Sequence, residues 1–114
     1  MTPRSQRHRL QDILEATERI HEYTGGNLRP ALDERLTRDA VLFNLTVIGE
    51  AAKHLSPEMK ERAPEVNWSA AAGLRDVLVH RYFGTDLEVI GALDAALSAV
   101  KVGVERLLRE LPED

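Results

Sequence analysis

The residues best suited to chemistry stand together in one short segment, residues 73–84, which reads GLRDVLVHRYFG. It places Arg75, Asp76, His80 and Tyr82 among apolar residues that recur at helical spacing, a pattern that predicts a short helix with one buried stripe. The polar side chains must then project away from that stripe. Histidine titrates near neutral pH, and the planar guanidinium of arginine binds anions, so metal-free acid–base chemistry on an anionic substrate is the chemistry that this segment could perform.

Helical geometry decides which of these side chains can work together. A helix turns by about 100° per residue, so Asp76 and His80 share a face and can touch. Arg75 and Tyr82 lie on nearly the same face with a rise of about 10 Å between them, whereas Arg75 and His80 diverge by about 140°. One copy of the helix cannot easily direct both Arg75 and His80 at one small group. Two copies that face each other across a symmetry axis could, which predicts a homodimer.

Other chemistries have little support in the sequence. There is no cysteine, and the four histidines are scattered without the spacing of a metal site. No glycine-rich phosphate loop and no G-x-S-x-G stretch occurs. We therefore expect neither a metal ion nor a cofactor.

The segment resembles the catalytic motif of the HEPN superfamily, in the Arg-x4-His-x-Tyr form typical of HepT-like toxin ribonucleases. Two further stretches are similar to that family: VIGEAAKHLS at residues 47–56, and APEVNW at residues 63–68, ahead of the motif. Together the three stretches cover roughly residues 40–87, and their order and spacing make the resemblance fairly specific.

The resemblance implies a metal-independent endoribonuclease that cleaves RNA by attack of its own 2′-OH. His80 would remove the 2′-OH proton or protonate the leaving 5′-oxygen, and Arg75 would hold the phosphate and stabilise its extra charge. Asp76 would support His80 by orienting the imidazole. DNA lacks the attacking hydroxyl and should be inert.

The resemblance also implies regulation by a partner. In this family an MNT-type nucleotidyltransferase antitoxin adenylylates the motif tyrosine, here Tyr82, so the chain would be the toxin of a toxin–antitoxin module. The added nucleotide would bring bulk and negative charge to the face of Arg75. The alternative is a non-catalytic helical dimer that serves as a binding or scaffold protein for a nucleotidyltransferase. The net charge of −4 and the pI of about 5.6 favour that alternative modestly, since a protein that coats nucleic acid would be basic.

The elements that position the motif are all helical. No stretch alternates with the period of a strand. Helices are expected at residues 4–24, 32–55, about 67–84 and 85–111, with one short helix from Ser56 to Ala63. Thr2 should cap the first helix, Gly25 and Gly26 should end it, and residues 27–30 should form a loop. The caps expected for the later helices are Ser56, Asn67 and Thr85. The 114 residues therefore predict a single all-α domain, residues 1–114, built as an antiparallel bundle of four main helices plus a short one and assembled as a HEPN-like dimer.

Composition fits an ordinary globular chain, with 43% hydrophobic residues and no run long enough to span a bilayer. No signal-peptide pattern opens the sequence, so we expect a cytoplasmic protein without membrane contact. The basic residues Arg4, Arg7 and Arg9 could contact RNA, although a solvated first turn is the simpler interpretation.

Several side chains of the bundle carry specific expectations. Leu36 and Phe43 should contribute to the buried face of the second helix, and Gly49 should mark a close helix contact. Glu50 could line the site, although a surface pair with His54 one turn later is slightly favoured. Trp68 should be a packing anchor.

Overall fold

The protein, seen here as a computed structural model, is described over residues 5–81 and 87–112, without the side chains of residues 76–81. Helices account for all of the regular structure in these ranges. They are α1 (Gln6–Thr24), α2 (Leu28–Ala31), α3 (Arg35–Lys53), α4 (Pro57–Glu61), α5 (Trp68–Arg81), α6 (Leu87–Gly91) and α7 (Asp94–Glu110).

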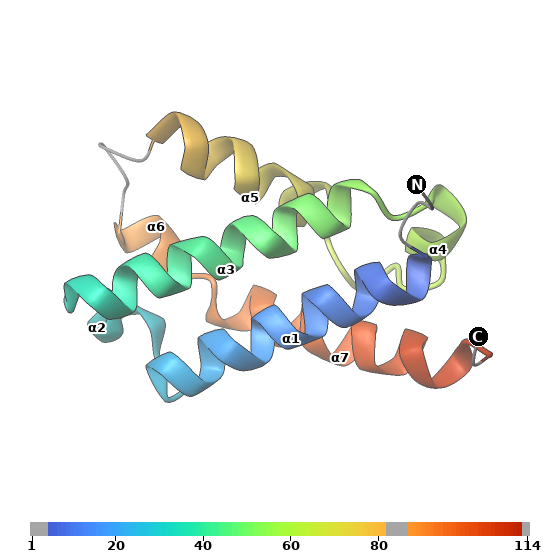
Figure 1. Cartoon of the computed structure of the whole chain (residues 1–114), viewed down its shortest axis with the longest axis horizontal. Helices are drawn as coiled ribbons and strands as arrows, with labels where there is room; N and C mark the ends of the chain where they lie inside the picture. The colour runs from blue at the N-terminus through green and yellow to red at the C-terminus, as the bar shows by residue number, and fades with distance from the viewer. Residues whose placement is uncertain (1–4, 82–86, 113–114) are drawn as a thin grey trace.

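The four long helices run antiparallel to their neighbours in the spatial order α5, α3, α1, α7 (Figure 1). The central pair, α1 and α3, packs along its length, α5 covers the outer side of α3, and α7 packs against α1. The helix that contains the motif segment, α5, is thus held mainly by α3. The all-α prediction is confirmed.

Aliphatic side chains fill the space between these helices, because α1, α3 and α7 present apolar stripes at three- and four-residue spacing. The fully buried large side chains are Leu10, Ile13, Leu28, Leu32, Val41, Leu45, Ile48, Val104 and Leu107. In the described part of the chain, no helix combines the length and the apolar character that crossing a membrane requires.

The prediction of one short helix was wrong, since the described residues form three. α2 occupies the stretch that was expected to be a loop. The expected last helix is divided at residues 92 and 93 into α6 and α7. α6 packs on α2, and there a Cβ on Gly91 would lie 2.7 Å from the Arg29 Cδ and 3.0 Å from its Cα, so glycine permits this close contact. Its expected capping residue Thr85 lies outside the described residues.

Two details of the long helices also differ from expectation. Ser5, rather than Thr2, caps α1 by accepting the His8 N–H at 3.1 Å. Leu36 and Phe43 do not join the core: they are 77% and 66% exposed on the outer face of α3. The αL conformation of Gly25, with φ 64°, ends α1 as the sequence predicted.

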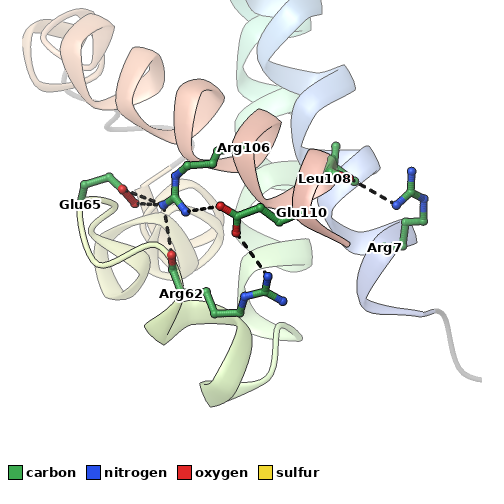
Figure 2. A network of polar contacts seen from close by, with 6 residues as sticks. All are labelled: Arg7, Arg62, Glu65, Arg106, Leu108 and Glu110. Carbon is green, nitrogen blue, oxygen red and sulfur yellow. Dashed lines mark hydrogen bonds and ion pairs between the residues drawn. The ribbon is translucent and has the colours of Figure 1, made fainter. Parts of the chain in front are cut away.

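A polar network fixes the connection that leads into α5 (Figure 2). Arg106 of α7 donates to both carboxylate oxygens of Glu65, at 2.6 and 2.8 Å, and to the Arg62 carbonyl at 3.1 Å. Glu110 accepts from Arg106 and Arg62, each at 3.3 Å. Since Glu65 and Arg62 lie between α4 and α5, α7 holds the segment that sets the starting position of the motif helix.

Candidate active site

The beginning of α5 is held by a cap and an aromatic anchor. The Asn67 side chain accepts the Ala70 N–H at 3.0 Å, as the sequence predicted for a capping residue. Trp68 is only 7% exposed, and its indole N–H donates to the Ala63 carbonyl at 3.1 Å. The prediction of Trp68 as a packing anchor is confirmed, and the register of α5 is fixed before the motif begins.

Gly49 brings α5 unusually close to α3 at the motif arginine. A Cβ placed on Gly49 would lie 2.7 Å from the Arg75 backbone nitrogen, 3.1 Å from the Arg75 Cβ and 3.3 Å from the Ala71 carbonyl oxygen. Real Cβ atoms essentially never approach backbone at 2.7 Å, so only glycine permits this separation of the helices. The expected close contact at Gly49 is confirmed, and its partner is the backbone of Arg75.

The next residue of α3, Glu50, forms an ion pair with the arginine. The Arg75 Nε lies 3.0 Å from the Glu50 Oε2, and the two side chains are 43% and 45% exposed. Oε2 itself is shielded from solvent, and among the described residues no donor has the geometry of a hydrogen bond to it. The positive charge of Arg75 is therefore a principal compensation for this covered oxygen.

The other carboxylate oxygen faces His54. The His54 Nε2 lies 3.1 Å from the Glu50 Oε1, so the expected i, i+4 surface pair is present as well. The hydrogen bond from His54, and after it the positive charge of Arg75, holds the pKa of Glu50 below its usual value. Glu50 is consequently ionised at neutral pH, with a cationic or donor group on each side.

The structure describes the predicted site residues only in part. Arg75 lies half-exposed on α5 beside Glu50. The backbones of Asp76 and His80 belong to the same helix, so the five-residue spacing of Arg75 and His80 implies the divergence of about 140° expected for one copy. The side chains of Asp76 and His80, and the whole of Tyr82, fall outside the described residues, so the predicted Asp76–His80 contact stays a prediction.

The ion pair across the two helices was missed from the sequence. Glu50 and Arg75 are far apart in the chain, and nothing in a single sequence gives the register of two packed helices. The available signal was the glycine directly before Glu50. A mid-helix glycine marks close approach of a neighbour, and the next residue then lies at the edge of that contact.

The arrangement suits binding of an anion. A half-exposed guanidinium with a fixed stem can present several N–H donors to a phosphate or carboxylate. In the described ranges, histidine, aspartate and glutamate do not gather in the groups of three that could hold a metal ion.

Comparison with known proteins places the chain in a family. A family profile described as "Ribonuclease HepT-like" matches residues 13–106. A probable ribonuclease HepT of Thermococcus cleftensis is 40% identical over 88 residues, which are 76% of this chain and 80% of that protein. A putative RNase of Methanocaldococcus jannaschii is 34% identical over 87 residues, or 75% of this chain and 80% of the relative. Another from the same organism is 31% identical over 106 residues, which are 91% of each chain. No solved structure gives a significant match.

Proposed function

Because the chain belongs to the ribonuclease HepT-like family, we propose that it is a metal-independent endoribonuclease in which Arg75 and His80 perform the chemistry. The relatives described as ribonuclease HepT and as putative RNases support an RNA-cleaving activity. The observation that carries the proposal for this chain is the placement of Arg75, which stands on the motif helix at the helix contact formed by Gly49 and is paired with Glu50.

The reaction needs only groups that the chain and the RNA supply. His80 takes the proton of the 2′-OH, whose oxygen attacks the adjacent phosphorus, or in the opposite role gives a proton to the departing 5′-oxygen. Arg75 binds the phosphate and stabilises the charge that grows on it. The products are a 2′,3′-cyclic phosphate, or its hydrolysed form, and a 5′-OH end.

We propose that the active form is a homodimer with the motif helices near the two-fold axis. The divergence of Arg75 and His80 on one helix supports a shared site. Leu36, Phe43 and Glu50 recur every seven residues, so the exposed apolar pair lies in line with the residue that holds Arg75. A second copy that covered Phe43 would therefore lie next to the Glu50–Arg75 pair.

Sedimentation tests the dimer. Phe43→Arg should give a monomer with little RNase activity, whereas Val102→Arg should change neither, because Val102 is similarly exposed, at 63%, but lies on α7. A monomeric wild type, or a Phe43→Arg dimer with full activity, would contradict the arrangement.

The biological role that we propose is that of a toxin neutralised by an MNT-type nucleotidyltransferase, which attaches AMP to Tyr82. Family membership is the support for this role. A nucleotide two residues from His80 would place bulk and negative charge where RNA must bind.

RNA cleavage in EDTA tests the enzymatic proposal. The purified wild type should cut RNA, and His80→Ala should not, while its helical circular dichroism stays unchanged. An inactive wild type that nevertheless binds a nucleotidyltransferase would favour the scaffold alternative.

A further inference from the structure

Glu50 is the charged side chain of α3 that contacts the motif arginine. Its Oε2 lies 3.0 Å from the Arg75 Nε, and this contact joins two different helices. The preceding residue, Gly49, fixes how closely the backbones approach at the same point. Gly49 thus sets the position of the Arg75 backbone, and Glu50, the next residue, contacts the Arg75 side chain.

The carboxylate of Glu50 is itself held in place. His54 binds Oε1 at 3.1 Å, while Oε2 is shielded from solvent and directed at Arg75. Rotation of the carboxylate would break the bond with His54 and move a covered oxygen away from its compensating charge. The contacts with His54 and Arg75 therefore favour one orientation of the carboxylate.

The point of contact on the guanidinium matters for chemistry. An ion pair at Nε restrains the side chain, and a guanidinium can also bind an anion because it has donors along more than one edge. Without such a contact, a long arginine side chain samples many rotamers, and each productive encounter must first order it.

We propose that Glu50 is a positioning residue of the ribonuclease: by binding Nε, it holds Arg75 in the orientation that meets the RNA phosphate. This inference rests on the proposed function. Glu50 touches neither the RNA nor the reacting atoms in this account, and acts only through Arg75.

Glu50→Gln tests the inference, because it keeps the size of the side chain and removes the charge. Glu15→Gln is the matched control, since Glu15 also forms an i, i+4 pair, with Arg19 at 2.7 Å on α1, and the net charge changes equally. We expect Glu50→Gln to lower the rate of RNA cleavage by about 5- to 100-fold. The control should stay within about twofold of wild type.

A double-mutant cycle separates positioning from a general effect. In the Arg75→Lys background the Nε contact is absent, so Glu50→Gln should lower the residual rate by less than about twofold. An equal loss in both backgrounds would show that Glu50 acts through something other than Arg75. An unchanged rate in Glu50→Gln alone would show that Glu50 has no role in cleavage, and a higher rate would show that it competes with RNA for the arginine; either would overturn the proposal.

A spectroscopic measurement distinguishes failure of this inference from failure of the proposed function. In the ¹H–¹⁵N NMR spectrum, the Arg75 Nε–H signal, assigned by its loss in Arg75→Lys, should show by ¹⁵N relaxation a more rigid side chain in the wild type than in Glu50→Gln. Equal rigidity in the two proteins would overturn the positioning role. If the rigidity differs but the wild type cuts no RNA, the contact exists, the proposed function is wrong, and the role assigned to Glu50 in cleavage is overturned with it.

Discussion

Gly49→Ala should separate the packing of α5 from its chemistry. An ordinary contact for a Cβ begins at 3.4 Å, and the new methyl group would lie 2.7 Å from the Arg75 backbone nitrogen. α5 must therefore move by roughly 0.7 Å, a backbone shift of the kind that costs about 1–3 kcal/mol. The higher helix propensity of alanine offsets up to about 1 kcal/mol of this loss in stability. The net expectation is a loss of about 0–2 kcal/mol in the free energy of unfolding.

Gly73→Ala is the matched control, because it makes the same change on α5 where a Cβ meets nothing within 4 Å. This variant should gain about 0.5–1 kcal/mol, so it should be more stable than Gly49→Ala by about 0.5–3 kcal/mol. Denaturant unfolding with a shared slope measures both. RNase activity of Gly49→Ala should fall by about tenfold or more, since the arginine moves with its helix. A Gly49→Ala protein as stable and as active as Gly73→Ala would refute the close packing at Arg75.

Three further predictions concern the anchor of α5, the cap of α3 and control of the activity. Trp68→Phe removes the donor to the Ala63 carbonyl and leaves space behind the ring, and should lower the free energy of unfolding by about 1–3 kcal/mol in denaturant titration. The Glu34 carboxylate accepts hydrogen bonds from the Leu36 and Thr37 N–H groups, and the Thr37 hydroxyl together with these backbone donors holds the pKa of Glu34 below its usual value. The stability that this cap contributes is therefore present above the ordinary glutamate pKa and is lost as the pH falls. Glu34→Gln should weaken this pH dependence in thermal melts at pH 3–6. Tyr82→Phe should keep most RNase activity yet resist silencing by the nucleotidyltransferase with ATP, whereas the wild type should gain the mass of one or more AMP groups; inactivity of Tyr82→Phe without any partner would instead make the hydroxyl catalytic.

Sequence patterns predicted those features that depend on neighbours along the chain. The apolar stripes of α1 and α7, the Ser56 and Asn67 caps and the glycine end of α1 are local, and the structure confirms each of them. The mid-helix position of Gly49 even predicted a close contact, although its partner could not be read from local patterns.

Features that depend on long-range packing could not be predicted from sequence patterns. Phe43 follows the apolar stripe of α3 in period, yet the helix packs on two neighbours that leave this side open, so the residue is exposed. The close approach of Gly91 to Arg29 and the Glu50–Arg75 pair both depend on the packing of helices that are distant in the sequence. Local patterns along a single sequence do not give these registers.

The most direct test of the central claim is the chemistry of the RNA ends. A 5′-labelled RNA and its fully 2′-O-methylated counterpart are incubated in EDTA with the wild type, Arg75→Ala and His80→Ala. The account predicts that only the wild type cuts, that it cuts only the unmodified RNA, and that the fragments carry a 2′,3′-cyclic phosphate or its hydrolysed form. Cleavage of the methylated RNA, a strict requirement for a divalent metal, or full activity of either variant would contradict it.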